Sequence, residues 1–130
     1  MDLAVIEPAL LALLHGHFDK GGRLQPFARE IMLVECAIAG TSFRELKEVE
    51  PTLPIGSLLL LKREPANEHD SLAIMILDEG GNQLGYVPRA KNEPLAHLMD
   101  AGKLLFGRLE CKEWQKNWLK ADIGIFLRDF

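Results

Sequence analysis

Short apolar runs separated by turn-forming residues constrain the fold of this chain more than any other feature of its sequence. Ser57–Arg63 holds four consecutive leucines, and Leu72–Leu77 holds Ala-Ile-Met-Ile. Each run has the length of a buried strand. Asp78–Asn82, with two glycines, predicts a hairpin turn because glycine reaches positive φ without strain. Gln83–Val87 is then the returning strand, so the middle of the chain is predicted to be antiparallel sheet.

Three further segments are predicted to extend this sheet. Glu30–Ala39 fits a strand or a short helix, and its β-branched residues and the stop at Gly40-Thr41-Ser42 favour a strand. Leu104–Glu110 and Ala121–Leu127 are the last two predicted strands, joined by a polar link over Lys112–Lys120. That gives about six strands in all.

Two helices are predicted besides the strands. Asn92 can cap a helix that runs to Ala101, with Pro94 in its first turn and Gly102 ending it. Ile6–Leu14 is a second helix, apolar on nearly all sides. A helix of that kind packs against its own domain or against a partner, and the sequence leaves both open.

The fold class that follows is mainly β with short helices, in a small barrel or strongly curved sheet. A chain of 130 residues is long enough for one domain with its own core. No run reaches eighteen apolar residues, so no membrane-spanning helix is expected. Two distant cysteines, Cys36 and Cys111, do not suggest a disulfide scaffold. We expect a cytoplasmic protein in which both thiols are free, small, buried groups.

The charge of the chain limits how it can meet nucleic acid. Lys and Arg number 15 against 19 Asp and Glu, for a formal net charge of −4. Proteins that coat DNA by releasing counterions carry a broad basic surface, which this composition excludes. From Leu84 onward the chain is instead slightly basic, with eight basic and six acidic residues. Any contact with nucleic acid is therefore expected at a local site.

No enzyme motif is present. The sequence lacks a P-loop, a dinucleotide-binding glycine motif, a zinc-protease motif and a nucleophile elbow. His15 and His17 lack nearby companions for a metal site. Cys36 with His69 or His97 would make a nucleophile and base, but its apolar neighbours favour core packing. We predict no catalysis, no metal and no cofactor.

The polar loop between the two most apolar runs, Arg63–Asp70, stands out. Asn and Asp shape loops by bonding to nearby backbone groups. A loop held rigid in that way can also present amides and side chains to a ligand. The two interpretations are compatible.

This loop resembles the pattern of the HIRAN domain family. The sequence Arg63-Glu64-Pro65-Ala66-Asn67-Glu68-His69-Asp70 follows the family's Arg-acidic-Pro-x-Asn-x-x-Asp arrangement, placed before a strand. Gly81–Arg89 is similar to the family's next hairpin, Asn92–Gly102 to its helix, and Ala39–Phe43 to the end of its first strand. The resemblance covers about residues 31–127. It divides the chain into an N-terminal helical extension, 1–30, and a HIRAN-like domain, 31–130.

The resemblance implies an OB-like barrel that binds the 3′-hydroxyl end of single-stranded DNA, in DNA repair or replication-fork processing. Asp70 would accept a hydrogen bond from the 3′-hydroxyl, and Arg89 would contact phosphate. The full set of nucleic-acid-binding residues that it implies is Phe43, Asn67, His69, Asp70, Tyr86 and Arg89. Ser42 and His69 depart from an arginine and a tyrosine in the family pattern, which implies weaker charge and stacking contacts.

The apolar helix predicted near the start of the chain leaves an alternative function open. Ile6–Leu14 would serve a protein-interaction or accessory module without DNA affinity, by docking on a partner or on a second copy.

Two tryptophans stand in the polar link before the last strand. Trp114 and Trp118 are four residues apart and share a face if their link is helical. They would then stack on bases or cover the barrel.

Overall fold

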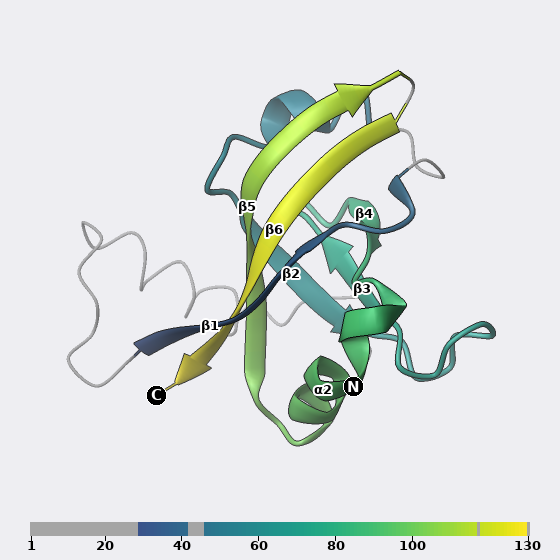
Figure 1. The fold of residues 1–130 in the computed structure, drawn as a ribbon, viewed down its shortest axis with the longest axis vertical. Helices are drawn as coiled ribbons and strands as arrows, with labels where there is room; N and C mark the ends of the chain where they lie inside the picture. Colours follow the sequence, from purple (N-terminus) through teal and green to yellow (C-terminus); the bar gives the residue numbers. More distant parts are fainter. Residues whose placement is uncertain (1–28, 42–45, 117, 130) are drawn as a thin grey trace.

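The computed structural model describes residues 29–41, 46–116 and 118–129, which form one antiparallel sheet and one α-helix (Figure 1). The elements are β1 (Arg29–Ala37), the 3-10 helix η2 (Glu50–Thr52), β2 (Leu58–Arg63), β3 (Ile74–Leu77), β4 (Gln83–Tyr86), α2 (Arg89–Asp100), β5 (Leu104–Gln115) and β6 (Trp118–Asp129). The strand order is β1-β6-β5-β2-β3-β4, and all neighbours are antiparallel. The prediction of a mainly β fold with six strands and an internal helix is confirmed.

The two ends of this sheet meet just after β1. The Ala39 N–H donates to the Tyr86 carbonyl and the Tyr86 N–H donates to the Ala39 carbonyl, each with a nitrogen–oxygen distance of 2.8 Å. Gly85 allows this approach, because a Cβ on it would overlap the Ala39 carbonyl oxygen and the Ile38 side chain. The bridge therefore curls the sheet into a small barrel-like body, with β5 and β6 curving along its length (Figure 1).

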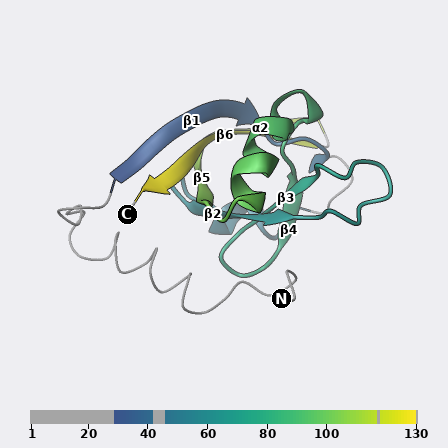
Figure 2. The same cartoon turned by 90° about the horizontal axis from the view of Figure 1, so that it is seen from below.

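Alternate side chains of the central strands enter two apolar clusters, as expected for strands buried on both faces. Leu59 and Ile76 belong to the larger, inner cluster, whereas Leu60 and Met75 belong to a smaller one on the opposite face. The smaller cluster is built around Phe106, which is fully buried. Helix α2 adds apolar residues to the inner cluster and lies between the β1–β6 arch and β3–β4 (Figure 2).

The start of the helix differs from the prediction. It begins at Arg89, directly after Pro88, whose carbonyl accepts the Lys91 N–H. Asn92 is therefore an interior helix residue and not its cap, and Pro94 lies beyond the first turn. The predicted end is confirmed, since Ala101 is the C-cap and Gly102 follows at a φ of +89°.

The predicted polar link before β6 is also wrong. Strands β5 and β6 continue through it as one hairpin, in which Trp114 pairs with Leu119 and Gln115 with Trp118. Because successive strand residues alternate in direction, the two tryptophans lie on opposite faces and not on one. The segment is polar in sequence because this end of the hairpin is largely solvent-exposed.

Several other predictions meet different outcomes. Cys36 is buried and free as predicted, but Cys111 is exposed, because it lies toward the polar end of the hairpin.

The predicted helix Ile6–Leu14 lies outside the described residues, as do His15 and His17. The docking role of this helix therefore stays a prediction. Within the described ranges, no helix is long and apolar enough to cross a membrane.

Candidate functional site

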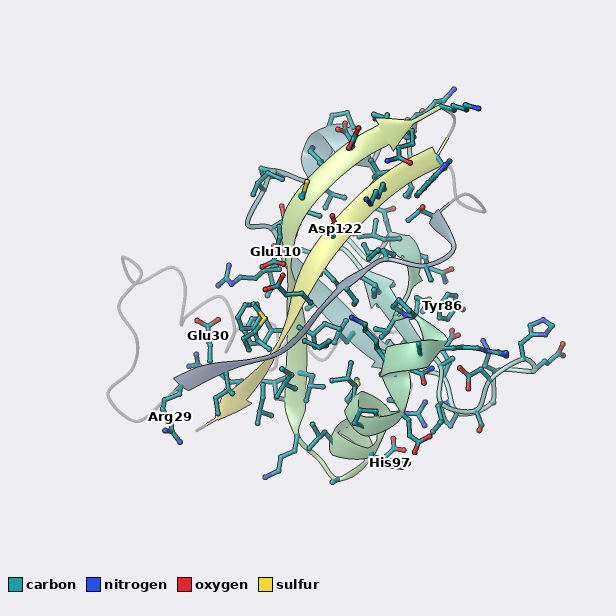
Figure 3. The ribbon with its side chains drawn as sticks, in the orientation of Figure 1. Arg29, Glu30, Tyr86, His97, Glu110 and Asp122 are labelled. Carbon is teal, nitrogen blue, oxygen red and sulfur yellow. The ribbon has the colours of Figure 1, made fainter. Side chains whose placement is uncertain are left out.

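A pocket of about 290 Å³ lies where the loop between β2 and β3 meets the end of β4 and the start of α2. It is lined by Ala39, Asn67, His69, Asp70, Ala73, Tyr86, Val87 and Arg89. The structure thus brings together five of the six residues singled out in the sequence. The sixth, Phe43, lies outside the described residues. Figure 3 shows Tyr86 on the side of the molecule from which the loop projects.

Asn67 sets the shape of the loop. Its Oδ1 accepts the backbone N–H groups of His69, at 2.8 Å, and Asp70, at 3.1 Å. Its Nδ2 donates to Glu64 Oε1 at 3.2 Å. With two donors on Oδ1, the side-chain carbonyl has no acceptor position left for a ligand. The loop-shaping interpretation of Asn67 is therefore confirmed.

Asp70 is the one carboxylate among the residues that line this pocket. Its Oδ1 accepts the Leu72 N–H at 2.9 Å, and its Oδ2 accepts Asn92 Nδ2 at 2.7 Å. The Leu72 N–H, followed by the Asn92 amide, holds the pKa of Asp70 below its usual value, against an opposing effect of burial. Asp70 is thus ionised at neutral pH, where it accepts hydrogen bonds and repels anions.

Tyr86 forms a wall of the pocket that is fixed at both its backbone and its hydroxyl. The hydroxyl donates to Glu64 Oε1 at 2.7 Å. Glu64 also receives the Asn67 amide, so it connects the loop to the end of β4. The backbone of Tyr86 makes the bridge to Ala39 that closes the sheet.

His69 and Arg89 form the exposed rim. The Arg89 guanidinium donates from Nη2 to the His69 carbonyl, and its Nε lies 3.7 Å from Asp70 Oδ2. The Arg89 side chain is 70% exposed and the His69 ring also faces solvent. A cation and a flat ring are therefore available beside the carboxylate.

Arg63 fastens both ends of the loop to the end of α2. Its Nε and Nη2 donate to the two carboxylate oxygens of Asp100 at 2.9 and 3.1 Å, and its Nη1 donates to the Ala73 carbonyl at 2.9 Å. The paired geometry is that of strong guanidinium–carboxylate contacts, and it lowers the pKa of Asp100. Because Arg63 precedes the loop and Ala73 ends it, the loop is held in place before a ligand arrives.

The sequence did not reveal the parts played by Asn92, Glu64 and Arg63. Asn92 is only 3% exposed and bonds to Asp70 from the fourth position of α2. A polar residue just before a predicted helix resembles a cap, and only the position of the helix start separates the two roles. Arg63 and Glu64 stood in the quoted motif, but each also has a distant partner: Asp100 lies 37 residues from Arg63, and Tyr86 lies 22 residues from Glu64.

Other parts of the described chain offer weaker candidates. A wider cavity of about 730 Å³ opens between the turn before β2 and the Asp78–Asn82 turn, and it holds none of the predicted site residues. Within the described ranges, no group of three or more His, Cys, Asp or Glu residues could hold a metal. Burial raises the pKa of the Cys36 thiol, which disfavours its use as a nucleophile.

Comparisons with known proteins place this fold among relatives. A protein from Lactobacillus plantarum has a crystal structure 27% identical in sequence, with a TM-score of 0.73, covering 79% of this chain and 99% of that one. The crystal structure of the HIRAN domain of human HLTF is 17% identical, with a TM-score of 0.61, and covers 77% of this chain and 79% of that one.

A second structure of the human domain is similar as well. It is the HLTF HIRAN domain in its DNA-bound conformation, 16% identical with a TM-score of 0.56, covering 86% of this chain and 84% of that one. No match was found among curated proteins. The model of the HIRAN domain family matches residues 31–128. The chain belongs to the HIRAN domain family.

Proposed function

We propose that this protein is a nucleic-acid-binding module that takes the 3′ end of single-stranded DNA into the pocket at Asp70. Membership of the HIRAN family supports this, as does the DNA-bound state of the HLTF domain, whose fold this chain shares. The observation that carries the proposal is the pocket itself, where an ionised carboxylate is held between a loop and a helix.

The chemistry of the pocket favours a hydroxyl-terminated end. An ionised carboxylate accepts hydrogen bonds, so it suits the proton of a 3′-hydroxyl and repels a 3′-phosphate. Arg89 at the rim pairs with the phosphate before the terminal nucleotide, and the exposed His69 ring offers a surface for its base. A volume of about 290 Å³ is near the lower limit for small-molecule sites, which suits one nucleoside.

The test compares two fluorescein-labelled single-stranded oligonucleotides that differ only in a 3′-hydroxyl or a 3′-phosphate. We expect weak binding by anisotropy at low salt, with the hydroxyl end bound at least about tenfold more tightly, as for one bond to a charged group. Asp70→Asn should remove this preference. The control is Glu93→Gln, which also removes one negative charge, from an exposed residue of helix α2 that does not line the pocket. This variant should keep the preference for the hydroxyl end. Equal affinity for the two ends would refute the proposal.

The cellular setting that we propose is DNA repair or replication-fork processing, in the cytoplasm. These 130 residues carry no ATPase motif, so the role that we propose for them is end binding and not strand remodelling. Loss of the gene should then sensitise cells to agents that stall replication forks. Unaltered sensitivity would argue against this setting without touching the binding proposal.

A further inference from the structure

The hydrogen-bond capacity of Asp70 is only half used by the described residues. A carboxylate offers about four acceptor positions, two on each oxygen. Oδ1 receives the Leu72 N–H and Oδ2 receives the Asn92 amide, at 2.9 and 2.7 Å. Arg89 Nε lies 3.7 Å from Oδ2, which is beyond hydrogen-bond distance. Within the described part of the chain, each oxygen therefore keeps one open acceptor position.

Asp70 is the one charged acceptor among the side chains that line the pocket, so it is the strongest acceptor there for a hydroxyl donor. The Asn67 side-chain carbonyl already accepts two N–H groups, and the Tyr86 hydroxyl, which donates to Glu64, is a neutral acceptor. The carboxylate is 20% exposed, so it is partly open to the pocket although its orientation is fixed by two bonds. Hydroxyl donors on a ligand are thus expected to bond preferentially to the two oxygens of Asp70.

Two open acceptors on adjacent oxygens suit two adjacent hydroxyls. A terminal deoxyribose supplies one hydroxyl donor, whereas a terminal ribose supplies two, at its 2′ and 3′ carbons. Acidic residues of dinucleotide-binding folds accept hydrogen bonds from ribose hydroxyls in this way, and the 2′-hydroxyl is the group by which proteins distinguish RNA from DNA. The number of open acceptor positions on Asp70 therefore bears on whether the terminal sugar of the ligand is ribose or deoxyribose.

We propose that Asp70 binds the 2′,3′-diol of a terminal ribonucleotide, so that the pocket prefers ribonucleotide 3′ ends to deoxyribonucleotide ones. This inference rests on the proposed function of the pocket and specifies its ligand. Asn92 is then a positioning residue, because it holds Oδ2 in place from the helix while leaving one acceptor position open. Leu72 does the same for Oδ1 through its backbone.

The test uses four labelled oligonucleotides with the same DNA body and different last sugars: ribose, 2′-deoxyribose, 3′-deoxyribose and 2′,3′-dideoxyribose. We expect the ribose end to bind about tenfold more tightly than the 2′-deoxyribose end, because it adds one hydrogen bond to a charged acceptor. The dideoxyribose end should bind most weakly. In Asp70→Asn, which has the same size but one acceptor oxygen fewer, the ribose advantage should disappear.

The outcomes separate this inference from the proposed function. Equal binding of ribose and 2′-deoxyribose ends, both tighter than dideoxyribose, overturns diol recognition and leaves 3′-end capture standing. Equal binding of all four ends overturns both. A ribose advantage that persists in folded Asp70→Asn also overturns the inference, because the second hydroxyl is then bound elsewhere. Should that variant fail to fold, the wild-type series alone still decides between these results.

Discussion

Replacing Gly85 with alanine tests whether the bridge between Ala39 and Tyr86 closes the sheet and forms the pocket. A Cβ at position 85 would overlap the Ala39 carbonyl oxygen and the Ile38 methyl group. The clash with Ala39 is with backbone, so it cannot be relieved by a rotamer change. The variant must move the segment after β1 away from β4.

The size of the effect follows from what that movement breaks. Forcing a methyl group into a packed interior costs about 1–3 kcal/mol. The two bridge hydrogen bonds, each 2.8 Å long, contribute about 0.5–1.5 kcal/mol apiece. We therefore expect Gly85→Ala to lower the free energy of unfolding by about 2–6 kcal/mol. At a urea slope of about 2 kcal/mol per M, typical of a small domain, this is a midpoint shift of about 1–3 M.

Urea unfolding followed by circular dichroism measures this shift, and Gly107→Ala is the matched control. Gly107 is a buried glycine of β5 in the same sheet, but a Cβ there meets its nearest neighbours at 3.4–3.7 Å, which is ordinary contact. Gly107→Ala should change the free energy of unfolding by less than about 1 kcal/mol. Similar losses of stability in the two variants would show that the bridge between Ala39 and Tyr86 does not close the sheet. Oligonucleotide binding by Gly85→Ala at the wild-type level would show that the bridge does not form the pocket.

Three further substitutions test single contacts of the pocket and of the sheet. The lowered pKa of Asp70 adds stability that is present above its unfolded value near 3.8 and is lost as the pH falls through the folded value. Acid should therefore destabilise the wild type more than Asp70→Asn in urea titrations, and parallel losses would contradict this. Thr41→Val should cost about 1 kcal/mol of unfolding free energy, because the buried Leu119 carbonyl loses the hydroxyl donor 2.6 Å away; an unchanged melting temperature would count against it. Arg63→Lys keeps the charge but loses the paired contact with Asp100, so both the thermal midpoint and oligonucleotide affinity should fall. An affinity equal to that of the wild type would show that the loop does not depend on this contact.

The sequence allowed the strands and the loop to be predicted because their signals are local. Four leucines in Ser57–Arg63 and two glycines in Asp78–Asn82 each determine nearby backbone. The polar end of β5 at Trp114 was missed because none of the residues from Cys111 to Gln115 is buried, so the strand shows no apolar alternation there, although its partner β6 carries the buried Leu119. The helix start at Arg89 was missed because Asn92 resembles a cap. The partner of the Asn92 side chain, Asp70, is 22 residues away in the sequence, and no local pattern reveals such a contact.

The resemblance implied six nucleic-acid-binding residues, and the structure shows how those that line the pocket are held. The side-chain carbonyl of Asn67 is occupied by two N–H groups of the loop, so a nucleotide contact by Asn67, which stays a prediction, is left to its Nδ2 group. Asp70 keeps open acceptor positions because Leu72 and Asn92 take only one on each oxygen. Leu72 and Asn92 thus determine which acceptor positions of the Asp70 carboxylate stay open.

This division of roles also accounts for how an acidic chain can bind a polyanion. With a net charge of −4, the protein has little general attraction for phosphates, and Arg89 is the one cationic side chain among the residues that line the pocket. A site that neutralises about one phosphate gains little from counterion release, so its binding depends weakly on salt. Under the proposed function, selectivity then comes from hydrogen bonds to the terminal sugar, which are short-range and need a rigid acceptor. The fastening of the loop by Arg63 and Asn92 supplies that rigidity, so the pocket depends on shape where a basic groove would depend on charge.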